Sequence, residues 1–421
     1  MPLRITHLSH NDQKGGGPLA SYRLHHALKD LGAESRMLVL EKHQDDPSVE
    51  QVDAGLWTTP IRYADRLPRR LYRKRMVDRI WSPGCFGIGG LEAHAAIKTS
   101  DILSFYWING GFLSVSGIDR LLRLGKPVIW RLSDFWPLTG GCHHPGDCAA
   151  YKTACNRCPQ LGSDRAHDLA AQQWQRKQRW PKDDLTIVAP SRWLADLAAN
   201  SALFRDVRIE HIRTGIDLHV FKPCAREKTR RALGLPLDRQ LLLFGANEAT
   251  RNPRKGFFEL VEALRILADR GRLDGVDLVL FGSDHTPDIP LDIRMHDRGV
   301  ITNEIEKASL FGASDLFVTP SLEENLPNTV IEAMASGTPA VAFDVGGTRE
   351  LIQHRNNGYL ARAKDVQDLA AGIATILDVA RTDPAIGERS RDAMVAAHDQ
   401  QMVAKRYLSL YEELHGLTIA A

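Results

Sequence analysis

Residues 319–339 read Thr319-Pro320-Ser321-Leu322-Glu323-Glu324-Asn325-Leu326-Pro327-Asn328-Thr329-Val330-Ile331-Glu332-Ala333-Met334-Ala335-Ser336-Gly337-Thr338-Pro339. The pattern predicts a strand that ends at Pro320, a polar loop, and a helix that begins near Pro327. The N–H groups at the start of such a helix attract an anion. Glu324 would lie in the loop beyond the strand, where open α/β sheets bind ligands, and Glu332 on the helix. Two carboxylates beside an anion site suit the hydroxyl groups of a sugar and a ribose.

Apolar strands and helices alternate on both sides of this stretch. Because the strands are continuously apolar, they suit a parallel sheet that is covered by helices on both faces. We therefore predict an α/β protein with two doubly wound domains that meet near residues 213–223. The predicted strands are residues 5–8, 37–40, 102–106, 127–132, 185–189, 241–245, 276–281, 316–319 and 340–343.

Length and charge limit the classes of function. A chain of 421 residues is long enough for two or three domains. Its 54 Lys and Arg nearly balance its 52 Asp and Glu, so the charge gives no sign of nucleic-acid binding. No apolar run is long enough to span a bilayer and the N-terminus does not resemble a signal peptide, so we expect a cytoplasmic protein.

The opening stretch resembles the retaining nucleotide-sugar glycosyltransferases of family 4 type, also called glycosyl transferases group 1. Their hallmark is two Glu separated by seven residues in a similar frame, although Asn325 and Leu326 stand here where the family has Gly-Phe. The resemblance implies the GT-B fold, in which two Rossmann-like domains face each other across a crevice. The expected parts are an acceptor-binding domain (1–214) with a Cys-rich insert (140–160), a nucleotide-sugar-binding domain (215–383), and helices that pack back toward the first domain (384–421).

The same resemblance implies a function. The enzyme would transfer a sugar, with retention, from a nucleoside-diphosphate sugar to a saccharide or lipid-linked saccharide during polysaccharide biosynthesis. Glu324 would contact the donor sugar and Glu332 the ribose. The full set of expected donor-binding residues is Gly16, Gly17, Arg251, Arg254, Lys255, Glu324, Asn325, Leu326, Asn328, Thr329 and Glu332.

Three cations follow the predicted strand 241–245. Cations can offset the charge of a departing diphosphate, so we expect no catalytic metal. Lys255 matches the family's lysine, whereas Ala246 occupies the position of the family's arginine. Arg251 or Arg254 would then supply the second positive charge from a longer loop. We predict Lys255 and Glu324 as catalytic residues.

Ser133 and Asp134 follow another predicted strand. Many relatives carry His immediately before the acid, and this chain carries Ser133 instead. Asp134 is our third predicted catalytic residue, with His143 or His144 as less favoured candidates for orienting the acceptor hydroxyl. The structural alternative for Asp134 is a turn or helix cap.

Four of the six cysteines cluster between residues 142 and 158. Cys155 and Cys158 have the two-residue gap of metal-binding turns, and Cys142 with Cys148 would complete four thiolates. A Cys-rich insert of this kind resembles a subgroup of these transferases that is involved in polysaccharide assembly. We expect structural zinc, with His143 or His144 as substitutes for one thiolate. Reduced free thiols and two disulfides are the alternatives.

Residues 60–80 carry a local net charge of +6, from eight cations and two acids. Apolar residues are interleaved with the cations, which is typical of a helix that lies on an anionic membrane. The alternative is a solvated face.

Two alternative functions of the whole chain remain open. One is a GT-B sugar-nucleotide epimerase, and the other is a nucleotide-sugar-binding protein with impaired catalysis, which Ser133 would favour.

Overall fold

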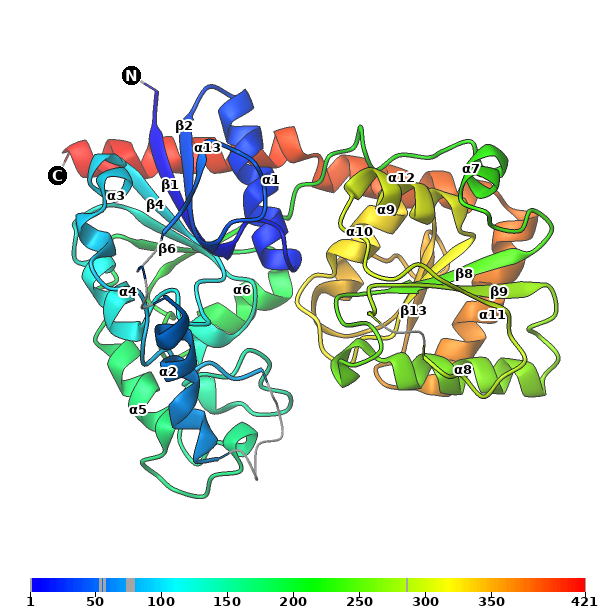
Figure 1. The fold of residues 1–421 in the computed structure, drawn as a ribbon, viewed down its shortest axis with the longest axis horizontal. Coiled ribbons are helices and arrows are strands. Elements are labelled where there is room, and N and C mark those ends of the chain that lie inside the picture. The colour runs from blue at the N-terminus through cyan, green and yellow to red at the C-terminus, as the bar shows by residue number, and fades with distance from the viewer. Residues whose placement is uncertain (1, 53–54, 56–57, 73–79, 285–286, 421) are drawn as a thin grey trace. The chain divides into compact units, whose positions relative to one another are not determined.

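The computed structural model describes residues 2–52, 55, 58–72, 80–284 and 287–420, which fall into two units (Figure 1). Unit 1 comprises the chain up to Gly215 and again from Gln401, and unit 2 comprises Ile216–Gln400. None of the described helices combines the length and apolar character that crossing a bilayer requires.

Unit 1 is built on a parallel sheet with the strand order β3-β2-β1-β4-β5-β6-β7. The order reverses between β1 and β4, which makes this the topological switch point. The described strands are β1 (Arg4–Asn11), β2 (Glu34–Glu41), β3 (Val49–Gln51), β4 (Ile102–Phe105), β5 (Val128–Arg131), β6 (Leu185–Ala189) and β7 (Arg208–His211). The described α-helices are α1 (Gly16–Asp30), α2 (Thr58–Arg70), α3 (Ala95–Thr99), α4 (Val115–Leu122), α5 (Leu169–Gln178), α6 (Arg192–Ala199) and α13 (Gln400–Ala420).

Unit 2 has a second parallel sheet, with the order β10-β9-β8-β11-β12-β13 and a switch point between β8 and β11. Its described strands are β8 (Gln240–Gly245), β9 (Val276–Phe281), β10 (Met295–Asp297), β11 (Leu316–Thr319), β12 (Ala340–Phe343) and β13 (Gly358–Ala361). Its described α-helices are α7 (Arg226–Ala232), α8 (Phe257–Asp269), α9 (Glu304–Ala313), α10 (Asn328–Ala335), α11 (Val366–Thr382) and α12 (Ala385–His398).

Both sheets are buried on both faces. In unit 1, Ile102 packs in one core cluster with residues of α1 and α13, whereas the next residue, Leu103, packs in another with residues of α3 and α4. In unit 2, Leu241 and Leu242 divide in the same way between two clusters. Alternate side chains of a strand point to opposite faces, so each strand must be apolar throughout. The predicted pair of doubly wound parallel sheets is confirmed.

The C-terminal helices differ from the prediction, which placed all of residues 384–421 against the first domain. Helix α12 belongs to unit 2, because Ile386 and Met394 are buried in the core clusters of that unit. Helix α13 belongs to unit 1, where Tyr407 and Tyr411 are buried in the same cluster as Ile5.

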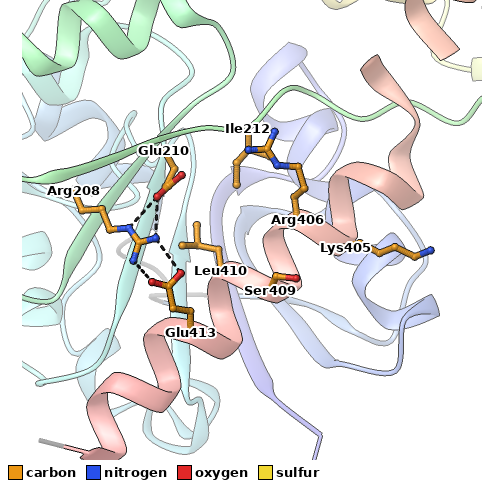
Figure 2. Close-up of a pocket in the computed structure, with 8 residues that line it drawn as sticks. All are labelled: Arg208, Glu210, Ile212, Lys405, Arg406, Ser409, Leu410 and Glu413. Carbon is orange, nitrogen blue, oxygen red and sulfur yellow. Dashed lines mark hydrogen bonds and ion pairs between the residues drawn. The ribbon is translucent and has the colours of Figure 1, made fainter. Parts of the chain in front are cut away.

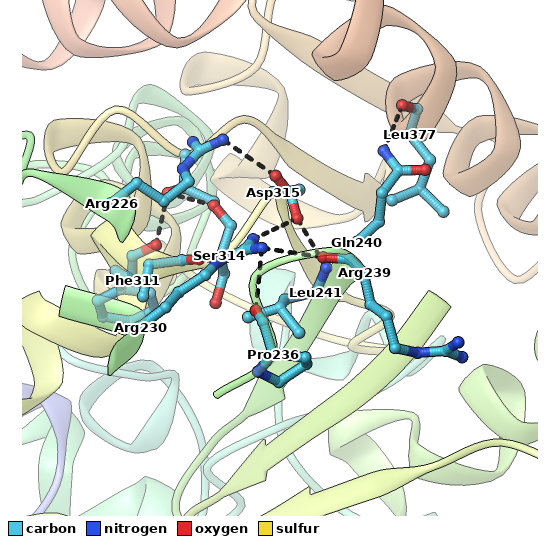
Figure 3. Close-up of polar contacts among 12 residues, drawn as sticks. Arg226, Arg230, Pro236, Arg239, Gln240, Leu241, Phe311, Ser314, Asp315 and Leu377 are labelled. Atoms are coloured by element: carbon cyan, nitrogen blue, oxygen red, sulfur yellow. Dashed lines mark hydrogen bonds and ion pairs between the residues drawn. The ribbon is translucent and has the colours of Figure 1, made fainter. Parts of the chain in front are cut away.

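Arg230 ties together the amino-terminal ends of two neighbouring strands in unit 2 (Figure 3). Its guanidinium donates to the carbonyl oxygens of Ala313 (2.8 Å) and Arg239 (2.9 Å), and to Asp315 Oδ2 at 2.6 Å. Asp315 Oδ2 also accepts the N–H of Leu241 at 2.7 Å. Arg230 and Asp315 therefore satisfy backbone groups at the amino-terminal ends of β8 and β11, at the opposite end of these strands from the loops of the switch point.

Arg230→Met should lower the free energy of unfolding of unit 2 by about 3 kcal/mol, because it removes the buried partner of a carboxylate. Arg226 bonds the same carboxylate at 3.0 Å from a largely exposed position, so Arg226→Met is the matched control, with an expected loss below about 1 kcal/mol. Urea unfolding of both variants measures this difference. Equal losses in the two variants would contradict this account of Arg230.

Candidate functional site

The loops that follow β8 and β11 touch at the switch point of unit 2. Gly256 precedes α8 with a φ of +77°, and a Cβ atom there would lie 1.8 Å from the carbonyl oxygen of Pro320. Leu322 N donates to the carbonyl oxygen of Arg254 at 2.8 Å. Only glycine allows this approach of one backbone to the other.

This contact brings Lys255 and Glu324 together. Lys255 Nζ donates to Glu324 Oε2 at 2.6 Å, and Arg254 Nη1 lies 3.7 Å from the same oxygen. Arg254 also donates to the carbonyl oxygen of Glu323 at 2.8 Å. All three charged side chains are 13–20% exposed, so they are accessible but partly desolvated. Two cations around one carboxylate leave a net positive charge here.

Arg251 is not part of this group. Its guanidinium pairs with Asp284 at 2.9 Å, and both side chains are 60% exposed. Of the two arginines considered for the diphosphate, the structure brings Arg254 to Lys255 and Glu324.

Glu332 lies on α10 and is buried, with an exposed fraction of 1%. Its Oε2 atom is 3.0 Å from Lys307 Nζ on α9. Lys307 could not be predicted from the sequence, because no local pattern indicates that a lysine of α9 faces α10.

Some of the predicted donor-binding residues between Glu324 and Glu332 are buried, and others are half-buried at the start of α10. Leu326 packs in a core cluster of unit 2, and the carbonyl oxygen of Asn325 accepts the N–H of Gly347 at 2.8 Å. Asn328 and Thr329 are half-buried in the first turn of α10, whose N-cap residue is a proline and supplies no side-chain cap.

In unit 1, the loop after β1, which carries Gly15, Gly16 and Gly17, approaches the carboxyl end of β5. Gly16 and Gly17 open α1, and a Cβ atom at Gly17 would lie 2.6 Å from Ser133 Oγ. Trp107, after β4, accepts the N–H of His10 on its carbonyl oxygen at 2.7 Å, and the two rings are 5.0 Å apart. The loops after β1, β4 and β5 thus meet at the switch point of unit 1. Sequence reasoning did not identify His10 or Trp107.

Asp134 is held by backbone and by a histidine. Its Oδ1 atom accepts the N–H of Trp136 at 2.9 Å, and its Oδ2 atom lies 2.7 Å from His143 Nδ1. Burial opposes ionisation of Asp134, but its interactions with His143, His144 and the N–H of Trp136 together outweigh it, and the pKa of the carboxyl is held below its ordinary value.

The predicted cysteine set lies in one insert of unit 1. Cys142, Cys155 and Cys158 are buried, Cys148 is half-buried, and none of them is in a disulfide. Burial, with the nearby thiol groups, raises the pKa of Cys142 well above its ordinary value. Lys177 is buried beside them and donates to the carbonyl oxygen of Thr139 at 2.9 Å, and burial lowers its pKa to about 7.

Within the part of the chain that the structure describes, one group places three ligand atoms suited to a metal within 4.8 Å of one another: His25, His26 and Asp46. The four cysteines are not in such a group. His25 is also hydrogen-bonded to Ser48 Oγ at 2.9 Å, and Lys29 Nζ donates to the same hydroxyl at 2.7 Å. Since the Lys29 ammonium would repel a cation, this group is better explained as a hydrogen-bond network.

The described part of the basic segment, residues 60–80, includes most of α2, which packs against unit 1 on one face (Figure 1). Asp65 is buried and accepts the N–H of Phe86 at 3.1 Å. The other face exposes Tyr63 and Leu67, and Leu71 follows the helix directly; their exposed fractions are 59%, 49% and 88%. The remaining predicted cations of the segment, Arg73, Lys74, Arg75 and Arg79, lie outside the described residues.

A pocket of about 330 Å³ lies between β7 and α13 (Figure 2). Arg208 bridges Glu210 at 2.9 Å and Glu413 at 2.7 Å across it. None of the predicted site residues lines this pocket. The bridge joins the C-terminal helix to the edge of the sheet, which is a structural role.

Comparisons with known proteins bear on the family and the fold of this chain. The family model described as "Glycosyl transferases group 1" matches residues 239–379. The chain is 30% identical to a D-inositol 3-phosphate glycosyltransferase of Thermobispora bispora over 408 residues, which cover 88% of this chain and 85% of the relative. It is 26% identical to the putative colanic acid biosynthesis glycosyl transferase WcaC of Escherichia coli, over 74% of this chain and 75% of that protein.

Two solved structures share the fold of the whole chain. Sucrose-phosphate synthase of Thermosynechococcus elongatus has a TM-score of 0.70 at 18% identity, covering 99% of this chain and 100% of the other. The HepE protein of Anabaena in complex with UDP-glucose has a TM-score of 0.64 at 17% identity, covering 97% of this chain and 99% of the other.

Proposed function

Because the chain belongs to the glycosyl transferases group 1 family and is a GT-B glycosyltransferase, we propose that it transfers a sugar from a nucleoside-diphosphate sugar with retention. The acceptor would be a saccharide or a lipid-linked saccharide in polysaccharide biosynthesis. The observation that carries the proposal is the 2.6 Å pair of Lys255 and Glu324 at the switch point of unit 2. The name of WcaC, a putative colanic acid biosynthesis glycosyl transferase, supports the acceptor class, and the UDP-glucose bound by HepE supports the donor class.

The donor site would work by electrostatics and without a catalytic metal. Lys255 and Arg254 would offset the charge that develops on the departing diphosphate, beside the N-terminus of α10. Glu324 would accept hydrogen bonds from hydroxyl groups of the sugar. Glu332 is the proposed ribose contact, but its carboxylate is 1% exposed and paired with Lys307, so the side chain would have to turn out of that pair to accept the ribose hydroxyls.

Retention follows if the acceptor attacks from the face that the diphosphate leaves. The bond from the anomeric carbon to the phosphate oxygen breaks and the bond to the acceptor oxygen forms. The departing phosphate oxygen then takes the acceptor's proton, so no side chain has to act as a strong base. In unit 1, Asp134 would accept a hydrogen bond from the acceptor hydroxyl.

Glu324→Ala and Lys255→Ala should each lower kcat/KM by about 100-fold or more, because each removes an interaction with the reacting groups. Lys255→Ala should also weaken the binding of a nucleoside diphosphate, whereas Glu324→Ala should not, since Glu324 contacts the sugar. Turnover with a panel of donor sugars and calorimetric titration with the diphosphates measure the two effects.

Arg251→Ala is the matched control and should keep near-normal turnover, since Arg251 pairs with Asp284 instead. Near-normal turnover in both Glu324→Ala and Lys255→Ala would refute the site. A wild-type protein that binds a nucleoside diphosphate but turns over no donor would favour a nucleotide-sugar-binding protein.

For access to a lipid-linked acceptor, we propose that the exposed face of α2 lies on anionic membranes. Tyr63, Leu67 and Leu71 would enter the interface, while Arg66 and Arg70, which are exposed beside them, would attract anionic headgroups.

Vesicles that contain phosphatidylglycerol should carry the protein upward in flotation, and vesicles of phosphatidylcholine alone should not. Replacing Arg66 and Arg70 by Ser should reduce binding by about five-fold per arginine, which corresponds to about 1 kcal/mol for each charge. Replacing the exposed Arg362 and Arg381 by Ser removes the same charge from unit 2 and should leave flotation unchanged. Absence of the wild type from both floated fractions would exclude this membrane contact.

We also propose that Cys142, Cys148, Cys155 and Cys158 hold a structural zinc ion. Three of these thiols are buried in the core of unit 1, where four thiolates would close the coordination of the metal. Their sulfur atoms do not all lie within 4.8 Å in this structure, so the insert would have to tighten around the ion.

Elemental analysis of protein purified without chelators should find about one zinc per chain, as one tetrahedral site requires. Cys155→Ser with Cys158→Ser should remove it, whereas Cys85→Ser with Cys224→Ser should not, because these two cysteines lie outside the insert. Zinc-free protein with four reactive thiols, or with two disulfides by mass, would support the respective alternative.

A further inference from the structure

His143 and Asp134 form a buried pair at the switch point of unit 1. Asp134 follows β5 directly, whereas His143 comes from the cysteine-rich insert. The N–H of Phe135 donates to the carbonyl oxygen of His143 at 3.1 Å, which holds the insert against the end of the strand. The two side chains are then 2.7 Å apart.

The hydrogen-bond partners define the tautomer of His143. A carboxylate only accepts hydrogen bonds, so the proton on Nδ1 must point to Asp134 Oδ2. Trp107 Nε1 also directs its N–H toward the same nitrogen at 3.4 Å, but an Nδ1 that carries a proton cannot accept it, so in this tautomer the two rings are only in contact. Nε2 is 2.8 Å from Ser82 Oγ, so the imidazole is held at both ends.

The segment between Asp134 and His143 is also held in place by buried hydrogen bonds. Lys177 donates to the carbonyl oxygens of Trp136 and Thr139, and its ammonium lies 3.4 Å from the centre of the Trp136 ring. Trp136 Nε1 donates to the carbonyl oxygen of Ser82 at 2.8 Å. The turn that carries Asp134 is therefore fixed by buried contacts.

The two side chains differ in access. His143 is 1% exposed and has no surface for a ligand, whereas Asp134 retains 11% of its side-chain surface. Asp134 also adjoins Ser133, which lies against the Gly17 loop. A ligand can therefore reach Asp134 but not His143.

We propose that His143 is a positioning residue that holds the Asp134 carboxylate turned so that it accepts the hydroxyl group of the acceptor. The proposal rests on the proposed function, and it assigns His143 to the acceptor rather than to the donor. His143 donates one hydrogen bond to Asp134 and does not itself touch the acceptor. Ser82 holds the far side of the imidazole ring.

Three variants of His143 separate positioning from packing. Asn can place its amide N–H where Nδ1–H lies, Gln can place its amide near Nε2, and Ala retains neither. His143→Ala should lower kcat/KM for the acceptor by up to about 100-fold, since small displacements of a reacting group have effects of this size. KM for the donor should not change. His143→Asn should recover most of the lost activity, and His143→Gln should recover little.

A double-mutant cycle with Asp134→Asn gives the second readout. If His143 acts through Asp134, His143→Ala should cause little further loss of turnover once Asp134 is Asn, because the two effects are not additive. Thermal unfolding of every variant accompanies the kinetics. If His143→Ala does not fold, the comparison of His143→Asn with His143→Gln decides the question alone.

The outcomes distinguish the two levels of the argument. A wild-type enzyme that transfers no sugar from any donor overturns the proposed function, and the role of His143 falls with it. A wild-type enzyme that transfers sugar, together with equal activity of the Asn and Gln variants or additive losses in the cycle, overturns the role of His143 alone.

Discussion

The contact between Gly256 and Pro320 controls the geometry of the donor site. A side chain at residue 256 would collide with the carbonyl oxygen of Pro320, and the backbone there has a positive φ. Because the two loops touch at this point, the residue before Gly256 and the carboxylate of Glu324 lie close enough to pair. The ion pair on which the proposed donor chemistry depends therefore follows from a backbone contact. Parallel strands bring the loops to the same edge of the sheet, and glycine lets them meet.

The interior of each sheet could be predicted from sequence, and its edges could not. The predicted strands correspond to β1, β2, β4, β5 and β6 in unit 1 and to β8, β9, β11 and β12 in unit 2. The four strands that sequence reasoning missed are β3, β7, β10 and β13, which are the two edges of each sheet. An interior strand is covered on both faces and reads as a continuous apolar run. The edge strands β7 (Arg-Ile-Glu-His) and β10 (Met-His-Asp) are short and polar, and only their pairing reveals them.

Prediction of the candidate site from the sequence is limited in the same way, to residues that stand in a local pattern. Glu324, Glu332 and Lys255 could be chosen because they stand in recognisable local patterns, and their roles toward the donor remain predictions. Lys307 could not be chosen, because it reaches Glu332 only through the packing of α9 beside α10. The sequence also left His143 and His144 as alternatives. The structure separates them, because the backbone bond from Phe135 brings His143 to Asp134.

The two candidate sites solve one electrostatic problem in different ways. A partly buried carboxylate without a partner would take up a proton and lose capacity to accept hydrogen bonds from hydroxyl groups. In unit 1 the contact with His143 opposes this for Asp134, and in unit 2 Lys255 donates a hydrogen bond to Glu324. Lys255 is 18% exposed, so it can also meet a diphosphate, whereas His143 is 1% exposed and can act only through its carboxylate. Exposure therefore separates a partner that can also bind substrate from one that can only orient its carboxylate.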